Sequence, residues 1–210
     1  MAKLLVIIPA YNEETAIVQT VNDVKAHCPE ADILVVNDCS RDATRAKLRE
    51  AGICHVDLPV NLGIGGGVQT GYAYAVAHDY DVTVQFDGDG QHRADCIQAL
   101  IAPVVEGRAD MAIGSRFRLT AQDQSGFRSS AARRTGIRLI SGLIRLCTGK
   151  TVRDATSGFR ACGREMTAFF AENYAQDYPE PEAIVTALSA GFRVTEVPVT
   201  MNERQGGVSS

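Results

Sequence analysis

The sequence contains no tryptophan, and only 6% of its 210 residues are aromatic. It also lacks a basic surplus, because 21 lysine and arginine residues are outnumbered by 25 aspartate and glutamate residues, for a formal net charge of −4. Proteins that bind nucleic acid usually carry a basic surface, and many of them stack bases on aromatic side chains. The composition therefore argues against a nucleic-acid partner.

Long apolar runs and paired cysteines are missing as well. No stretch approaches the roughly 20 apolar residues of a membrane helix, and the apolar run at residues 4–8 is too short for a secretory signal. The six cysteines form no CxxC pair and no zinc-type cluster with histidine, and the chain has no Asn-x-Ser/Thr sequon. We therefore expect reduced thiols in a cytoplasmic protein.

The sequence contains 45% hydrophobic residues, enough to form the core of one domain of ordinary size. Short branched runs alternate with helical patterns, which predicts an α/β fold with an open, mainly parallel sheet and helices on both faces. Pro9 is expected to end the first strand, and the glycine-rich residues 61–67 are expected to form a turn. The predicted strands cover residues 4–8, 33–36, 53–58, 82–86, 111–114 and 193–199.

Polar side chains follow the first, second and fourth predicted strands, where open parallel sheets bind their ligands. Asp87-Gly-Asp-Gly-Gln-His92 is the sharpest of these motifs. Two carboxylates at this spacing suit a hard divalent cation. The alternative is a solvated turn in which an aspartate caps the next helix, and the residues alone leave both open. The glycines at 63–67 do not match a dinucleotide fingerprint, and Gly149-Lys-Thr151 lacks the first glycine of a P-loop.

Residues 129–147 predict a basic amphipathic helix, preceded by an arginine-bearing segment at 116–128 that we expect to be a mobile loop. Isoleucine and leucine share one face, and arginines occupy much of the rest. Such a helix either packs on the core as an ordinary surface helix or lies on an anionic membrane surface.

Several motifs, in fixed order, resemble the family 2 glycosyltransferases of the GT-A fold. The resemblance covers essentially the whole chain, and it is nearest to the polyprenyl-phosphate sugar synthases, the dolichol-phosphate mannose synthase-like branch. In the second motif, Asn37 and Cys39 replace the aspartate and glycine that are usual in the family. The motifs are Pro9-Ala-Tyr-Asn-Glu13, Val36-Asn-Asp-Cys-Ser-Arg-Asp42, Asn61-Leu-Gly-Ile-Gly65, Asp87-Gly-Asp89, Gly114-Ser-Arg116, Asp154-Ala-Thr-Ser-Gly-Phe-Arg160 and Arg204-Gln-Gly-Gly-Val-Ser209.

The resemblance implies roles for residues along the chain. Those expected around the nucleotide are Pro9, Tyr11, Glu13, Asp38, Gly63, Gly65 and Asp87, with Asp38 accepting a hydrogen bond from the base. Those expected to hold Mg²⁺ or Mn²⁺ are Asp87, Asp89 and Gln91. Those expected to meet phosphates are Arg116, Arg133 or Arg134, and Ser209. Those expected to be catalytic are Asp89, Asp154 beside the sugar or acceptor, and Arg204, which would close over the diphosphate with Ser209.

The implied reaction is an inverting, metal-dependent transfer of a sugar from a UDP- or GDP-linked donor to a polyprenyl phosphate such as undecaprenyl or dolichyl phosphate. Within one GT-A domain, residues 1–115 would form a Rossmann-like nucleotide-sugar half and residues 116–210 an acceptor half with a mobile C-terminal segment. We also expect peripheral contact with the cytosolic face of a membrane, and a membrane partner protein or a homo-oligomer.

The lipid-phosphate transferase has three alternatives: the same enzyme with another acceptor, a binding module and a nucleotidyltransferase. A lipid phosphate is already ionised, whereas a glycan or other hydroxyl acceptor would need a general base, for which Glu180 or Glu182 is the nearest candidate. A sugar-nucleotide-binding module without turnover would have little need of the Asp87, Asp89 and Arg204 side chains. A nucleotidyltransferase would need an N-terminal glycine-rich triphosphate loop, which residues 9–14 do not provide.

Overall fold

The computed structural model describes residues 2–117 and 131–202, and for residues 131–135, 137 and 138 it describes the backbone alone. These residues form a seven-stranded sheet with the order β3-β2-β1-β4-β6-β5-β7. Neighbouring strands are parallel except where β6 pairs with β4 and β5. The strands are β1 (Leu4–Ala10), β2 (Asp32–Asn37), β3 (His55–Asp57), β4 (Val82–Gln85), β5 (Met111–Ser115), β6 (Arg160–Gly163) and β7 (Val194–Pro198).

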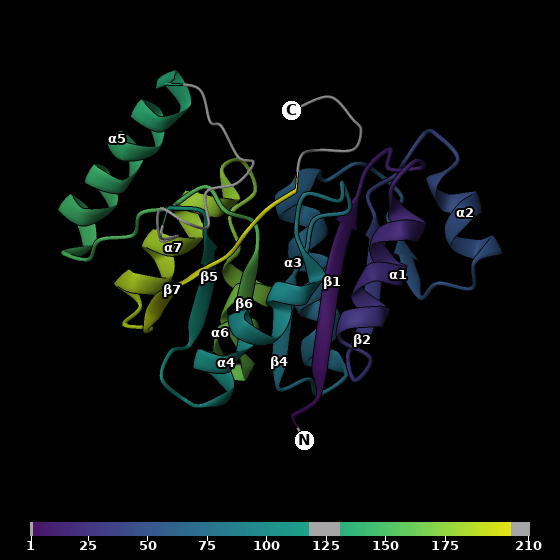
Figure 1. Cartoon of the computed structure of the whole chain (residues 1–210), viewed down its shortest axis with the longest axis horizontal. Coiled ribbons are helices and arrows are strands. Elements are labelled where there is room, and N and C mark those ends of the chain that lie inside the picture. The colour runs from purple at the N-terminus through teal and green to yellow at the C-terminus, as the bar shows by residue number, and fades with distance from the viewer. Residues whose placement is uncertain (1, 118–130, 203–210) are drawn as a thin grey trace.

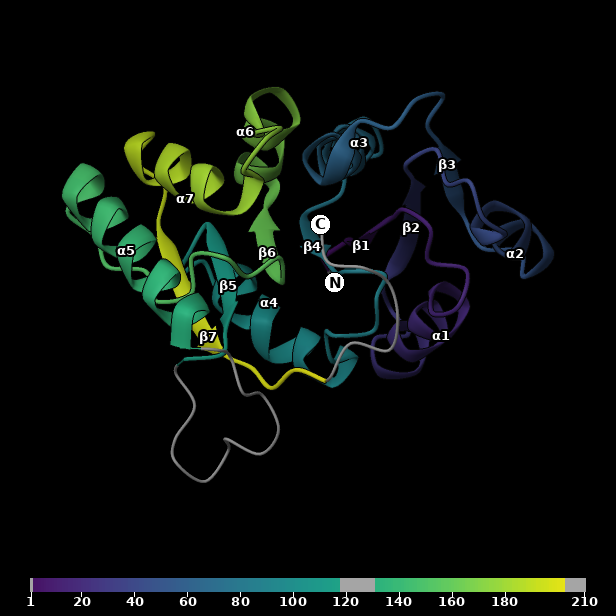
Figure 2. The same cartoon turned by 90° about the horizontal axis from the view of Figure 1, so that it is seen from above.

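Helices cover both faces of the sheet, as Figure 2 shows, with α1 and α4 on one face and α3, α6 and α7 on the other. A hydrophobic core lies on each face of the sheet, because successive side chains of β1 point to opposite faces. Val6 packs in the layer of α1 and α4, and Leu5 packs in the opposite layer. Helix α5 packs against α7 at the end of the molecule away from α2 (Figure 1). The helices are α1 (Ile17–His27), α2 (Thr44–Glu50), α3 (Gly63–Ala77), η1 (Ala94–Cys96), α4 (Ile97–Val105), α5 (Ala131–Thr148), α6 (Arg164–Asn173) and α7 (Pro179–Ser189).

The expectation that Pro9 ends the first strand is wrong. β1 continues to Ala10, and Pro9 pairs in register with Val36 of β2. The amide nitrogen of Pro9 faces the β4 side, where the β4 ladder already ends at Ile7. Proline therefore removes no hydrogen bond from the sheet at this position.

The glycine-rich segment is helical, and not a turn as expected, because α3 begins at Gly63. The glycines serve close packing: a Cβ atom on Gly65 would stand 2.4 Å from the carbonyl oxygen of Ala175. α1 begins at Ile17, since residues 13–16 form a turn, and α7 begins at Pro179, a residue suited to a first helical turn.

Strand β6 was missed by the sequence analysis, which treated residues 154–160 only as a motif. It has four residues and begins with a buried arginine, so it shows neither an apolar run nor a useful alternation. Because β6 is antiparallel, its first residue lies at the sheet edge where the parallel strands end. The segment that precedes β6 is thereby delivered to that edge.

No helix in the described ranges is both long enough and apolar enough to cross a membrane. The expected mobile loop lies outside the described residues, apart from Arg116 and Phe117.

Candidate active site

The site lies at the edge of the sheet where the parallel strands end. The first, second and fourth predicted strands, which carry the polar motifs at their ends, are neighbours, because β2, β1 and β4 lie side by side. The loops after β1 and β2 also bind each other: Asn12 Oδ1 accepts the Arg41 N–H at 2.8 Å, and Ser40 Oγ accepts the Asn12 N–H at 3.0 Å. The three loops therefore lie at one edge of the sheet, and two of them bind each other.

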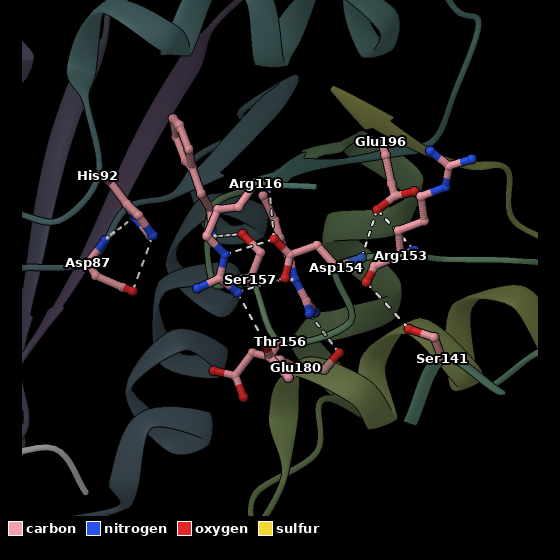
Figure 3. Close-up of polar contacts among 12 residues, drawn as sticks. Asp87, His92, Arg116, Ser141, Arg153, Asp154, Thr156, Ser157, Glu180 and Glu196 are labelled. Carbon is pink, nitrogen blue, oxygen red and sulfur yellow. Dashed lines mark hydrogen bonds and ion pairs between the residues drawn. The ribbon is translucent and has the colours of Figure 1, made fainter. Parts of the chain in front are cut away.

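The turn after β4 is held by His92, which is buried. His92 Nδ1 accepts the backbone N–H of Asp87 at 2.9 Å, so the ring proton belongs on Nε2, which lies 3.4 Å from Asp87 Oδ2 (Figure 3). The imidazole stacks on Phe159 with ring centroids 4.8 Å apart. Burial lowers the pKa of His92 to about 4. A neutral imidazole thus fixes the start of the turn that carries both aspartates.

Asp87 and Asp89 differ in exposure. The Asp87 side chain is one-third exposed, whereas Asp89 is buried and its Oδ1 accepts the Gln91 N–H at 3.0 Å. No cluster of three or more His, Cys, Asp or Glu residues suited to a metal occurs in the described parts of the chain. The predicted ligands Asp87, Asp89 and Gln91 offer two carboxylates and one amide oxygen. That set fits Mg²⁺ or Mn²⁺, since such ions need few protein ligands when water and substrate phosphate complete the shell.

Arg116 and Asp154 form a buried, two-pronged ion pair. Asp154 Oδ2 accepts the Arg116 Nε–H at 2.8 Å and the Arg116 backbone N–H at 2.9 Å, and Oδ1 accepts from Nη2 at 2.7 Å. The Asp154 side chain has no exposed surface, and the Arg116 side chain is 8% exposed. The resemblance places Asp154 beside the sugar or acceptor, and in the structure its carboxylate holds the Arg116 guanidinium.

Several predicted nucleotide residues lie on the β1 and β2 side of the site. Tyr11 is 44% exposed, whereas Pro9 is buried within β1. Asp38 is buried, and its Oδ1 accepts the N–H of Leu62 at 2.7 Å, which fixes the entry to α3. Glu13 is half-buried and its N–H donates to Thr44 Oγ1.

The two predicted glycines near the nucleotide differ. Gly63 has a φ of 74° and open space at its Cβ position, whereas the backbone of residues 175 and 176 already occupies that space at Gly65.

The remaining predicted residues lie outside the described structure in whole or in part. Arg204 and Ser209 fall beyond residue 202, and the side chains of Arg133 and Arg134 are not described. The described chain nevertheless ends beside the Asp89 turn, since the Asn202 N–H donates to the Gln91 carbonyl at 2.8 Å.

Three contributors were missed by the sequence analysis: His92 as an anchor, Arg160 and Glu196. Arg160 is fully buried, and its guanidinium donates to the Ser157 and Glu180 carbonyls. The sequence did offer a signal for Arg160 and Glu196, because each is a charged residue within a strand. A charge in that position needs a partner.

A solved structure shares this fold. Glucosyl-3-phosphoglycerate synthase from Mycobacterium tuberculosis, crystallised with Mn²⁺, uridine diphosphate and phosphoglyceric acid, superposes with a TM-score of 0.76 at 19% identity. The match covers 98% of this chain and 72% of that one. The expected GT-A fold is confirmed, with a mixed sheet that is not closed.

The family follows from the sequence. Residues 5–169 match the profile described as Glycosyl transferase family 2, and the chain belongs to this family. It is 32% identical to polyprenol monophosphomannose synthase of Mycolicibacterium smegmatis, over 99% of this chain and 80% of that protein. It is 31% identical to undecaprenyl-phosphate mannosyltransferase of Micrococcus luteus, over 99% of this chain and 86% of that protein. The protein is a glycosyltransferase, and its resemblance to the polyprenyl-phosphate branch is confirmed.

Proposed function

We propose that this glycosyltransferase transfers a sugar, with inversion, from a UDP- or GDP-linked donor to a polyprenyl phosphate. One observation carries the proposal. The turn with Asp87 and Asp89 and the Arg116–Asp154 pair both lie at the edge of the sheet where the parallel strands end. The names of the relatives, two of which are polyprenyl-phosphate mannosyltransferases, support a lipid phosphate as acceptor.

In this proposal residues 1–115 bind the donor and residues 116–210 bind the acceptor. Asp87, Asp89 and Gln91 would hold Mg²⁺ or Mn²⁺, which when bound stabilises negative charge on a diphosphate. Arg116, kept in place by Asp154, would meet phosphate, with Arg204 and Ser209 closing from the C-terminal segment. The acceptor phosphate would attack the anomeric carbon while the nucleoside diphosphate leaves from the opposite face.

A membrane surface would bring the lipid acceptor to the site, and α5 is the element suited to it. Its sequence carries four arginines and no acidic residue, in a chain whose net charge is −4. Ile144 packs inward, whereas Leu139, Leu143 and Leu146 are 66%, 53% and 82% exposed on another face. We propose that this apolar face lies on an anionic leaflet, as a peripheral contact from the cytosolic side.

The test is a transfer assay with polyprenyl phosphate in detergent, a panel of UDP- and GDP-sugars, and either Mg²⁺ or Mn²⁺. Lipid-linked sugar and free nucleoside diphosphate should form in equal amounts. Asp89→Asn should abolish transfer, because it removes a metal-binding charge. Asp95→Asn should not, since Asp95 pairs with Arg93 on the surface nearby. Asp89→Asn with wild-type transfer would refute the metal site, and nucleotide binding without any product would favour a binding module.

A second candidate acceptor is a sugar or other hydroxyl, for which Glu180 is the base. In Figure 3 the Glu180 carboxylate extends toward the side on which Asp87 lies, whereas Glu182 is exposed. With a lipid phosphate, neither Glu180→Gln nor Glu182→Gln should cost the roughly 10²–10⁴-fold that loss of a general base costs. A loss of that size with unchanged nucleotide binding would identify a hydroxyl acceptor.

A further inference from the structure

We propose that Glu196 is a positioning residue that holds Asp154, and through it Arg116, in place for transfer, a role that rests on the proposed function. Glu196 lies in β7, the edge strand of the sheet. Its Oε1 accepts the backbone N–H of Asp154 at 2.8 Å and that of Arg153 at 3.1 Å. One carboxylate oxygen therefore fixes two successive peptide groups.

These peptide groups lie outside every helix and strand, so no regular structure supplies their hydrogen bonds. Hydrogen bonds to a carboxylate are shorter and about twice as strong as neutral ones. From the other side, Ser141 Oγ of α5 donates to the Arg153 carbonyl at 3.4 Å. The segment is thus held between β7 and α5, the element proposed to face the membrane.

Asp154 links Glu196 to Arg116 through direct hydrogen bonds. Glu196 fixes the Asp154 main chain, and the Asp154 carboxylate accepts three hydrogen bonds from Arg116 (Figure 3). Arg116 Nη2 also donates to Thr156 Oγ1 at 3.0 Å. A shift of the Asp154 main chain would move the guanidinium with it.

Substitution of Glu196 should leave the fold intact. Its side chain borders a surface cavity of about 250 Å³, which Arg153 and Thr195 also line. Water can therefore reach the two N–H groups when the carboxylate is removed, and no buried donor is stranded. Any loss of transfer can then be attributed to position.

The experiment compares Glu196→Ala and Glu196→Gln with the matched control Asp110→Asn. Asp110 also accepts a backbone N–H, that of Arg193 just before β7, and its side-chain oxygens bind Arg193 at the opposite end of that strand from Asp154. Glu196→Ala should lower kcat for transfer by about 10- to 100-fold, because a displacement of about 1 Å can cost that much. Glu196→Gln retains an acceptor oxygen and should lose less.

Two further readouts separate position from general damage. In Asp110→Asn the Kd for nucleoside diphosphate should stay within about twofold, as for a distant site. In Glu196→Ala that Kd should rise, because Arg116, which is proposed to meet phosphate, is displaced with Asp154. Hydrogen exchange of the peptide that spans residues 151–156 should accelerate in Glu196→Ala and not in Asp110→Asn.

Wild-type transfer by Glu196→Ala, or an equal loss in Asp110→Asn, would overturn the inference. Absence of transfer by the wild-type protein would instead refute the proposed function, and unchanged exchange in Glu196→Ala would still refute the link to Asp154.

Discussion

The main chain of Gly158 lies directly against the carboxylate of Asp87. A Cβ atom at position 158 would stand 3.1 Å from both oxygens of Asp87 and 3.1 Å from Nε2 of Gln85. Those separations are shorter than ordinary van der Waals contact, so a side chain at this position must displace its neighbours. The segment before β6 and the turn after β4 therefore share one packed boundary within the site.

Gly158→Ala should reduce metal-dependent nucleotide binding, because the new methyl group pushes Asp87 out of position. Overpacking of this kind costs about 1–3 kcal/mol of stability. Gly142→Ala is the matched control, since its Cβ position on α5 is open, and alanine there should raise stability by about 0.5–1 kcal/mol. Titration of nucleoside diphosphate with Mn²⁺ by calorimetry checks the effect. Equal affinities in the two variants would contradict it.

His92 should make stability fall as the solution is acidified from pH 6.5 to pH 4. Burial lowers the pKa of His92 from its ordinary 6.5 to about 4, so in this interval the unfolded chain binds a proton that the folded protein refuses. The contribution of the neutral ring to the free energy of unfolding is complete above pH 6.5, and up to about 3 kcal/mol of it is lost by pH 4. Urea unfolding of wild-type protein and His92→Gln across this range gives the difference. Parallel pH curves would show that His92 does not titrate in this way.

Cys39→Gly should stabilise the protein. Cys39 has a φ of 56°, in the left-handed region that glycine adopts without strain. Relief of that strain is worth about 1 kcal/mol, reduced by the greater freedom of glycine in the unfolded chain. Thermal unfolding should show a higher Tm with transfer activity unchanged. A lower Tm would indicate that the Cys39 thiol, which lies 3.7 Å from the Pro59 carbonyl oxygen, stabilises more than the strain costs.

Substitution of Leu143 and Leu146 by asparagine should weaken binding to vesicles that contain phosphatidylglycerol by at least about tenfold, since two leucine side chains lose their apolar contact. The matched control is Val105→Asn, because Val105 is 55% exposed at the end of α4. Added salt should weaken binding of all variants through the arginines. Vesicle flotation measures the bound fraction. Equal flotation of the double variant and the control would remove α5 as the contact.

The sequence predicted the donor side of the fold well and the acceptor side poorly. β1, β2 and β4 are joined by helical connections, so their order and the meeting of their loops follow from local patterns. β6 is different: it is short and pairs with β4 across 75 or more residues of chain, and no local pattern marks such a partner. The contacts of Arg116, Asp154 and Glu196 depend on the pairing of β5 with β6 and β7, which is equally distant in sequence. For that reason the motifs were visible in the sequence but their arrangement was not.

Close approaches were equally hidden. Gly65 and Gly158 look alike in sequence, yet one accommodates the backbone of residues 175 and 176 and the other accommodates the Asp87 carboxylate. Only the path of distant chain segments decides which neighbour a glycine admits.

The position of β6 between β4 and β5 also sets an order of events during synthesis. β3, β2, β1 and β4 all lie within the first 85 residues and can assemble as soon as they leave the ribosome. β5 ends at Ser115, but both of its neighbours, β6 and β7, begin at Arg160 or later. Synthesis proceeds at about 5–20 residues per second, so about 2–9 s pass between the synthesis of β5 and that of its first neighbour, β6. During that interval the nascent chain exposes an apolar strand whose two edges have no hydrogen-bonded neighbour. Contact with a chaperone would matter most at this stage.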